Sequence, residues 1–396
     1  MSDSSAARVA SLYIHVPFCA QKCAYCAFYS EPSGRELVNR YVAALIRELE
    51  MVAGDLKPRT IFFGGGTPSL LNLRQWEQIL RALERLDLLG AEEFTVECNP
   101  ATISSDKAKL LRDFGVNRIS MGVQSLDENL LERLGRIHTR GMVFKSFDIL
   151  RRAGFDNLNF DLMFAIPGQT MAIWRDTLNE AVAMQSEHLS SYEVIYEDDT
   201  PLFAQLQAGK FATNEDLACA MYEELVECAT AAGFQQYEVA NFARDERTTI
   251  QSPNARLQTP IPKFACRHNV NYWRGGSFYG LGPSATSYVR GVRTKNWSNT
   301  QLYCEQLEKG KRAVESREEL PPLLRAGETA AFGLRMVAGW PFEKFQRTTN
   351  FDLRDEWAAE MNQLVERGWA EILPDSFRLT PQGLRFADAA AELFLR

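Results

Sequence analysis

The sequence lacks the features of membrane-spanning, secreted and nucleic-acid-binding proteins. Among its 396 residues, no apolar run is long enough to span a bilayer. The first ten residues, MSDSSAARVA, contain no apolar core of a signal peptide. The formal net charge is −7 and there is no basic tract, which argues against a phosphate-backbone partner. We therefore expect a cytoplasmic protein with no nucleic-acid partner and no stable membrane span.

Cysteines are few, and most of them stand alone. There are eight in the chain. Five are scattered singly: Cys98, Cys219, Cys228, Cys266 and Cys304. The other three stand close together in the stretch HVPFCAQKCAYCAF, with the spacing C-x₃-C-x₂-C: Cys19, Cys23 and Cys26. Scattered partners and a reducing compartment argue against a disulfide pair with a spare thiol.

The close trio can wrap one face of a cubane iron–sulfur cluster. Three cysteines hold three irons, and a fourth Cys that would close the cluster is missing nearby. One iron is then left open to a small chelating ligand. The alternative is a structural zinc site, for which His15 is the only near candidate as fourth ligand.

Short apolar runs alternate with longer amphipathic stretches along the first half of the chain. The spacing predicts strands at 11–16, 60–63, 93–98, 118–123, 158–164 and 189–194. It predicts helices near 36–53, 73–87, 104–114, 127–134, 141–153 and 171–184. Six such units indicate an α/β fold, a partial (β/α)6 barrel with helices outside a parallel sheet. Reactive residues then belong on the loops at the carboxyl ends of the strands.

The alternation of predicted strands and helices ends after about residue 240, which suggests three regions. We expect a core barrel over 1–243 and a smaller, mostly helical, winged-helix-like C-terminal domain over 300–396. Residues 244–299 would form a linker loop and a HNVNYW segment packing on the core. Within that region 244–265 is polar and lacks apolar periodicity, so it is expected to be a surface loop. Near the end we expect a strand pair at 369–374 and 377–380, then a helix from Pro381.

The cysteine loop, with the aromatic Tyr25 before its last Cys, resembles the radical S-adenosylmethionine (SAM) superfamily. Over residues 11 to about 300 the chain is similar to the HemN/HemW group, through motifs in that group's order. These are HVPFC, FGGGTPS, ECNP, RISMGVQS, LGRIHT, DLMFAIPGQT, TPLF, GFQQYEVANFA and HNVNYW. The resemblance implies a 4Fe–4S cluster on the three close cysteines. Its open iron would chelate SAM, which electron transfer cleaves to a 5′-deoxyadenosyl radical.

Polar and small residues near the strand ends are the candidates for binding SAM. Three glycines after the second strand let a ligand approach the backbone closely, although a tight turn would also explain them. Glu97 ends the third strand, where its carboxylate can accept ribose hydroxyls or lie free in solvent. Asp161 lies among apolar strand residues and would be costly to bury unpaired. The full set is Tyr13, Tyr25, Gly64, Gly65, Gly66, Thr67, Glu97, Gln124, Arg136 and Asp161. Tyr13 could instead belong to the core.

Three features favour the HemW-type haem chaperone over the other branch, oxygen-independent coproporphyrinogen III dehydrogenase. The dehydrogenase carries a further Cys two residues after the last cluster Cys, and this chain has Phe28 there. Its N-terminal extension is also missing, since eighteen residues precede Cys19. The segment HNVNYW (268–273) matches the HNxxYW motif associated with haem binding. Radical oxidative decarboxylation of coproporphyrinogen, or radical SAM chemistry on an unknown substrate, remain the alternative functions.

The chaperone reading implies binding haem and passing it to acceptor haemoproteins, with a reductant of the flavodoxin or ferredoxin type. His268 is then the expected axial haem ligand, and Cys266 is the next candidate. The alternative is that His268 hydrogen-bonds inside an aromatic loop. A homodimer is left open as an assembly. Ala165 stands where the group has Gly before IPGQT. The other histidines are expected to form structural hydrogen bonds: His15, His138 and His188.

Overall fold

The computed structural model describes residues 7–32, 34–245 and 261–395, and these form two compact units. The first unit contains residues up to 187, 191–222 and 277–318. The second contains 188–190, 223–276 and 319 to the end. These ranges differ from the expected domain ranges, which stay a prediction. Most of the loop expected at 244–265 lies outside the described residues, which exclude 246–260.

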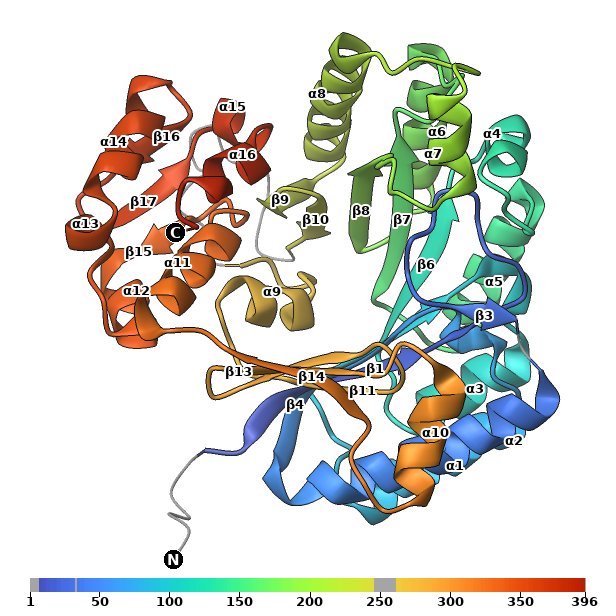
Figure 1. Ribbon diagram of the computed structural model, residues 1–396. Coiled ribbons are helices and arrows are strands. Elements are labelled where there is room, and N and C mark those ends of the chain that lie inside the picture. The colour runs from blue at the N-terminus through green and yellow to red at the C-terminus, as the bar shows by residue number, and fades with distance from the viewer. Residues whose placement is uncertain (1–6, 33, 246–260, 396) are drawn as a thin grey trace, which may run out of the picture. The chain divides into compact units, whose positions relative to one another are not determined.

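A parallel sheet forms the centre of the first unit (Figure 1). Its strands are β1 (Val9–Val16), β4 (Leu56–Gly65), β5 (Glu93–Cys98), β6 (Arg118–Gln124), β7 (Leu158–Phe164) and β11 (Tyr279–Leu281). The hydrogen-bonded order is β11-β1-β4-β5-β6-β7, and every neighbouring pair is parallel. Most side chains of β1, β5, β6 and β7 are buried on both faces, as expected for strands covered on both sides.

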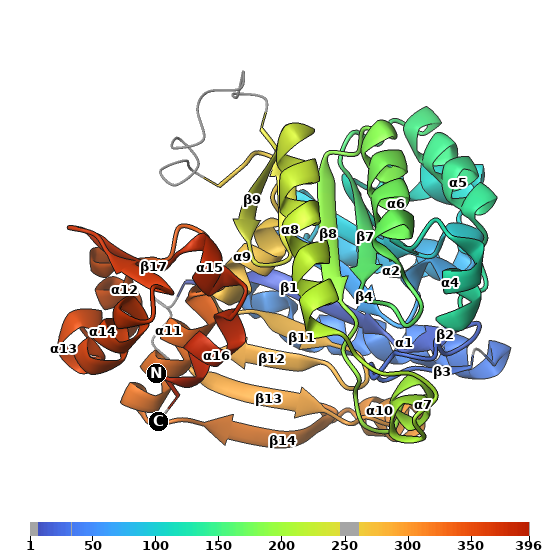
Figure 2. The same ribbon diagram turned by 90° about the horizontal axis from the view of Figure 1, so that it is seen from above.

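Helices follow the strands in the predicted alternation and lie outside the sheet (Figures 1 and 2). They are α1 (Arg35–Val52), α2 (Leu73–Arg85), α3 (Ser105–Asp113), α4 (Glu128–Arg133), α5 (Arg140–Arg152) and α6 (Met171–Ala183). Contacts join α1 to α2, α2 to α3 and α3 to α5, so these helices share one face of the sheet. A doubly wound sheet would divide them between two faces, so the prediction of a partial barrel is confirmed.

Local signals in the sequence explain where these helices begin. Asn72 caps α2 and exchanges hydrogen bonds with Gln75 in a capping box. Thr139 and Thr170 accept from the first-turn amides of α5 and α6. The residues at which these helices begin are therefore set by local hydrogen bonds, and so is the end of each turn that connects a strand to its helix.

Smaller elements complete the first unit. They are β2 (Phe18–Cys19), β3 (Glu31–Pro32), α7 (Pro201–Gln207), β12 (Thr286–Val289), β13 (Val292–Asn296), α10 (Thr300–Glu308), β14 (Val314–Glu319) and the 3₁₀ turns at 53–55, 68–70 and 100–102. Glu48 of α1 is fully buried but well partnered: its carboxylate accepts from Gly282 N, Asn296 Nδ2 and Tyr303 Oη at 2.7–2.9 Å. This network ties the segment that contains β11 to β13 and α10 to α1.

The second unit combines an antiparallel group of strands with the C-terminal helices. The strands β8 (His188–Glu193), β10 (Asn241–Arg244) and β9 (Phe234–Glu238) pair antiparallel in the order β8-β10-β9, and the residues of β8 that pair with β10 are 188–190, which belong to this unit. The helix α8 (Glu215–Ala231), whose first residues belong to the first unit, precedes β9, and α9 (Arg267–Trp273) follows β10. The remaining elements are α11 (Pro322–Gly333), β15 (Trp340–Pro341), α12 (Phe342–Thr349), α13 (Leu353–Glu356), α14 (Ala358–Glu366), β16 (Ala370–Ile372), β17 (Ser376–Leu379), α15 (Pro381–Leu384) and α16 (Ala387–Glu392).

The C-terminal part of this unit has the small helical architecture expected from the sequence. The strands β15-β17-β16 form an antiparallel sheet, and α12 to α14 lie between the first two strands in sequence. Its core is rich in aromatics, with Trp340, Phe345, Trp357, Phe377 and Phe394 all fully buried. The expected strand pair and the helix from Pro381 are confirmed. Across the described residues of both units, no helix has the length and apolar character to cross a membrane.

Candidate functional site

A cavity of about 600 Å³ in the first unit collects most of the predicted site residues. It is lined by the cysteine loop and by residues at or after the carboxyl ends of β4, β5, β6 and β7. The predicted residues that line it are Cys19, Cys23, Tyr25, Cys26, Gly65, Gly66, Thr67, Glu97, Gln124, Arg136 and Asp161. The loop rule for parallel α/β folds therefore explains why residues far apart in the sequence share one cavity.

The three close cysteines all face this cavity as partly exposed free thiols. The Cys19 Sγ lies 3.5 Å from Thr67 Oγ1, which connects the cysteine loop to the glycine turn after β4. The Cys23 Sγ lies 3.5 Å from the guanidinium nitrogen Nη1 of Arg136. Burial raises the pKa of the Cys26 thiol. All eight cysteines are free thiols in this structure.

This arrangement fits the three-thiolate side of a cubane cluster. Among the described residues, no three Cys, His, Asp or Glu side chains converge to hold a single metal ion. A cubane does not require such convergence, because each thiolate binds its own iron. The cation at Cys23 complements a thiolate, and iron binding would remove the Cys26 thiol proton that burial favours. When bound, a cluster would supply an open iron for SAM and the electron that cleaves it.

The glycine turn packs tightly against the start of the cysteine loop. Gly66 N donates to Val16 O, and Thr67 N donates to Phe18 O, both at 2.8 Å. A Cβ at Gly66 would come within 2.7 Å of Phe18 O. Gly65 has a φ of +102°, and a Cβ there would lie 2.5 Å from the ring of His15. A side chain at either position would push the turn away from the cysteine loop, so these glycines are required by close approach.

Two acidic side chains face the cavity, Glu97 from β5 and Asp161 from β7, the strands on either side of β6. Burial, reinforced by the nearby charge of Asp161, raises the pKa of Glu97 from 4.5 to about 8, although the amide of Gly65 donates to its carboxylate. Asp161 accepts from Ser120 Oγ at 3.1 Å and from Asn159 Nδ2 at 2.7 Å. These two hydrogen bonds reduce the cost of placing Asp161 among apolar strand residues. Together, Glu97 and Asp161 offer acceptors for hydroxyl or ammonium groups of a ligand.

Arg136 connects the cysteine loop to the end of β6. Its Nη2 donates to Gly122 O at 2.6 Å, and its Nη1 lies 3.5 Å from Tyr25 Oη. Gln124 ends β6 with a φ of +64°, a left-handed conformation that non-glycine residues adopt at a cost. The strain reorients the backbone at the position where Gln124 enters the lining of the cavity.

Two predicted SAM residues do not line this cavity. Tyr13, in the described strand β1, places its hydroxyl 3.1 Å from His15 Nδ1. Gly64, also described, lies behind Glu97, whose carboxyl carbon would be 3.1 Å from a Cβ at that position. Their role in binding SAM stays a prediction.

Sequence reasoning missed several lining residues. Ser120 and Gly122 line the cavity together with Gln124, because alternate residues of a strand share one face. The same alternation identifies Met163, two residues after Asp161 on β7. Applying strand alternation inward from Gln124 on β6 and outward from Asp161 on β7 would have found these three residues.

The three other histidines form hydrogen bonds, as predicted. His15 Nε2 lies 3.0 Å from Tyr29 O, His138 Nε2 lies 3.1 Å from Val123 O, and His188 Nε2 lies 2.8 Å from Tyr237 Oη. Burial, with the nearby charge of Arg136, lowers the pKa of His138 to about 4, so this ring is neutral at physiological pH.

His268, the predicted haem ligand, is buried in the second unit. It lies on α9 with 1 % of its surface exposed. Its Nε2 is 2.7 Å from the hydroxyl of Tyr272, one helical turn further on. Cys266, the second candidate, is fully buried at the N-cap of the same helix. In this conformation Nε2 can ligate iron only after the Tyr272 hydroxyl moves away.

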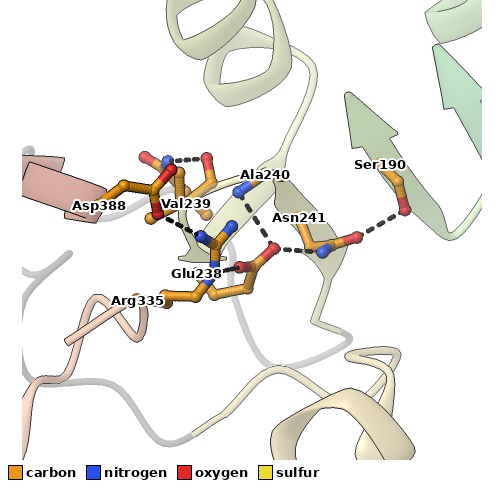
Figure 3. Close-up of polar contacts among 8 residues, drawn as sticks. Ser190, Glu238, Val239, Ala240, Asn241, Arg335 and Asp388 are labelled. Carbon is orange, nitrogen blue, oxygen red and sulfur yellow. Dashed lines mark hydrogen bonds and ion pairs between the residues drawn. The ribbon is translucent and has the colours of Figure 1, made fainter. Parts of the chain in front are cut away.

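Both ends of α9 are held by residues from other parts of the second unit. At the start, Cys266 N donates to Tyr237 Oη at 3.1 Å. At the end, the guanidinium of Arg335 lies 4.9 Å from the ring centroid of Trp273. Arg335 also pairs with the buried Glu238, at 3.7 Å between Nε and Oε2 (Figure 3). The position of α9 therefore depends on the strand β9 and on the C-terminal helical part together.

Figure 3 shows the hydrogen bonds and the ion pair that stabilise the buried carboxylate of Glu238. Its Oε1 accepts from Ala240 N at 3.0 Å and from the side-chain amide of Asn241, whose own oxygen accepts from Ser190 Oγ. Burial raises the pKa of Glu238, and the charge of Arg335 opposes that rise. The opposite charge and the hydrogen bonds reduce the cost of burying this carboxylate.

Models of two protein families match the chain. The Radical SAM superfamily model matches residues 13–181, and the HemN C-terminal domain model matches residues 320–386. The first match contains the cysteine loop and the strand ends that line the cavity. The second contains most of the C-terminal helical part, including Arg335.

Curated relatives match along nearly the whole chain. "Heme chaperone HemW" of Lactococcus lactis is 33% identical, covering 97% of this chain and 97% of that protein. "Heme chaperone HemW" of Escherichia coli is 31% identical, covering 97% and 98% respectively. Among solved structures, coproporphyrinogen III oxidase (HemN) of Escherichia coli, a radical SAM enzyme, superposes with a TM-score of 0.81 at 20% identity. That superposition covers 98% of this chain and 90% of the oxidase, and it shows a shared fold.

Proposed function

Because the chain belongs to the HemW family of the radical SAM superfamily, we propose that it is a haem chaperone that binds haem and passes it to acceptor haemoproteins. Bacterial relatives that match over nearly the whole chain carry this name. On this proposal, a 4Fe–4S cluster and SAM occupy the cavity in a supporting role. Haem delivery, rather than turnover of a porphyrin substrate, is the physiological outcome.

The observation that carries the choice between chaperone and dehydrogenase is the side chain at position 28. The cavity holds the cluster and SAM candidates, but its outer wall carries Phe28, which is 69% exposed. A phenyl ring cannot ligate iron or donate a proton. The resemblance that implies a further Cys at this position in the dehydrogenase therefore supports the chaperone.

The cavity residues have separate tasks in this proposal. Cys19, Cys23 and Cys26 hold the cluster, and the turn at Gly65 to Thr67 receives the methionyl end of SAM through its exposed backbone. Glu97 and Asp161 accept hydrogen bonds from ligand hydroxyl or ammonium groups. Gln124, Arg136 and Tyr25 complete the polar wall, and the packing of the turn on the cysteine loop keeps these groups at fixed separation.

His268 ligates haem iron in this proposal, through Nε2. Because Nε2 lies at 2.7 Å from the Tyr272 hydroxyl, haem binding begins with rotation of that tyrosine. The chaperone then works in the cytoplasm with a flavodoxin- or ferredoxin-type reductant, and a homodimer is one assembly to test. The domain ranges 1–243, 244–299 and 300–396 belong to the same proposal.

The test is anaerobic reconstitution of the cluster followed by spectroscopic titration with haem. Wild-type protein should bind haem, and His268→Ala should weaken binding while leaving the iron–sulfur absorbance intact. Tyr272→Phe keeps the ring but removes the hydroxyl on Nε2, so it should bind haem at least as tightly as wild type. Unchanged haem retention in His268→Ala would move the ligand elsewhere, with Cys266 next to test.

An activity assay separates the chaperone from the dehydrogenase. Coproporphyrinogen III is supplied anaerobically with SAM and a reductant, and protoporphyrinogen is measured. The proposal predicts no sustained turnover. Robust formation of protoporphyrinogen would refute the chaperone function and leave the cluster assignment in place.

A further inference from the structure

A buried lysine on α3 lies behind the wall of the cavity. Lys107 is 9% exposed, and its ammonium donates to Ser69 O and, at 2.9 Å, to Thr102 O. Ser69 belongs to the 3₁₀ turn at 68–70, directly after the glycine turn, and Thr102 belongs to the 3₁₀ turn at 100–102, after β5. Burying an ammonium is costly unless it is hydrogen-bonded, and both acceptors here are backbone oxygens. One cation therefore connects the segment after β4 to the segment after β5.

The hydroxyl of Ser69 makes a second connection between the same two segments. Ser69 is fully buried, and its Oγ accepts from Asn99 N at 3.0 Å. The same oxygen lies 2.6 Å from Thr102 Oγ1, which also donates to Asn99 O at 2.8 Å. We call these four residues the turn cluster: Ser69, Asn99, Thr102 and Lys107. All of its hydrogen bonds are made within the first unit.

The turn cluster lies beyond the point where β4 and β5 pair. The last residues that pair in this part of the sheet are Phe63 and Val96. The glycine turn and Glu97, which face the cavity, come after them. The register of the two strands therefore fixes these segments only at their start, and contacts further along decide how far apart they lie. The turn cluster supplies such contacts from behind the cavity wall.

Lys107 and Ser69 are both absent from the described lining of the cavity, so they can act on a ligand only through the segments that they connect. In the proposed function the glycine turn receives the methionyl end of SAM, and Glu97 accepts from its hydroxyl groups. SAM therefore spans both segments. A ligand that contacts only one of them does not depend on their separation.

We propose that Lys107 is a positioning residue for SAM, which together with Ser69 holds the glycine turn and the Glu97 segment at the separation that SAM spans. The inference rests on the proposed function, because that function places SAM in this cavity. Holding the two segments in place before binding saves the cost of ordering them when SAM binds.

Binding of SAM and of its two halves tests this role. SAM, methionine and 5′-deoxyadenosine are each titrated into cluster-loaded full-length protein under anaerobic conditions. Lys107→Met keeps an apolar stem but removes the ammonium, and Ser69→Ala removes the hydroxyl. Each should weaken SAM binding roughly tenfold, about the contribution of one hydrogen bond. Methionine and 5′-deoxyadenosine should bind as tightly as they bind wild type, because each half contacts one segment.

Lys109→Met is the matched control. Lys109 is on the same helix, but 74% of its side chain is exposed, and it pairs with Asp113 at 2.8 Å. This variant should bind all three ligands as wild type does. Iron and sulfide content should stay at the wild-type value in every variant, because the glycine turn has its own backbone hydrogen bonds to the start of the cysteine loop.

Wild-type SAM affinity in Lys107→Met would overturn the inference. An equal loss for SAM and for its two halves would also overturn it, since that result indicates general damage to the site, and so would an equal loss in Lys109→Met. If Lys107→Met does not fold, Ser69→Ala decides in its place. Wild-type protein that binds no SAM would overturn both the inference and the cofactor part of the proposed function, whereas the other results leave the proposed function standing.

Discussion

Gly66→Ala gives the sharpest test of how the glycine turn serves the cavity. The added Cβ would lie 2.7 Å from Phe18 O, 2.8 Å from Val16 O and 2.9 Å from Phe18 N. All three atoms are backbone, so no side chain can rotate out of the way. The turn itself must move, and with it Thr67, whose hydroxyl lies 3.5 Å from Cys19 Sγ. Overpacking of this kind costs about 1–3 kcal/mol.

The consequence should appear in the affinity for SAM. If binding must restore the displaced turn, the cost corresponds to a loss of roughly 5- to 150-fold. The assay is equilibrium binding of SAM to anaerobically reconstituted protein, with iron content measured on the same samples. Gly54→Ala is the matched control, because nothing lies within 4 Å of a Cβ at Gly54. Wild-type SAM affinity in Gly66→Ala, or an equal loss in Gly54→Ala, would refute the reasoning.

Two further predictions follow from the same part of the fold. The pKa of Glu97 is about 8 in the folded protein and 4.5 in the unfolded chain, so the folded protein holds this proton more tightly. As pH rises from about 4.5 to about 8, the free energy of unfolding of wild type should therefore fall relative to that of Glu97→Gln. Urea unfolding of cluster-free protein at pH 5 and pH 8 checks this, and an equal difference at both values would contradict it. Ala165 has a φ of +56°, so Ala165→Gly should raise the free energy of unfolding by roughly 0.5 to 1 kcal/mol. Ala153→Gly, at a φ of −78°, should lower it in the same thermal or urea measurement.

Much of the barrel could be predicted because its strands and helices carry local signals. The predicted strand at 118–123 is β6 (Arg118–Gln124), and the predicted helix at 141–153 is α5 (Arg140–Arg152). Buried parallel strands are nearly continuous apolar runs, and the helices between them show a clear 3.6-residue period. Thr139 and Asn72 mark helix starts that the periodicity alone leaves uncertain by a residue or more.

The set of residues around the cavity was predictable for a different reason. Parallel strands place their carboxyl ends on one side, so Gly66, Glu97 and Gln124 had to approach one another once the fold was right. The resemblance supplied their roles. Ala165 was noted as a departure from a glycine pattern, and its positive φ gives the physical reason for that pattern.

Other features depend on long-range packing and left no local signal. The exposure of Phe28 and Ile195 at the cavity mouth cannot be deduced from loop sequences. The contact of Arg335 with Glu238 joins segments far apart in the chain. The hydrogen bond between His268 and Tyr272 was readable in principle, because residues four apart on a helix face one another. The short α9 itself was not predicted.

The central claim is that three cysteines hold a cluster with one iron open to SAM. The direct measurement is iron and sulfide content of anaerobically reconstituted wild-type protein, followed by electron paramagnetic resonance of the reduced sample with and without SAM. The account predicts about four irons and four sulfides per chain, and a spectrum that changes when SAM is added. Protein that assembles no cluster, or a cluster whose spectrum ignores SAM, would contradict it.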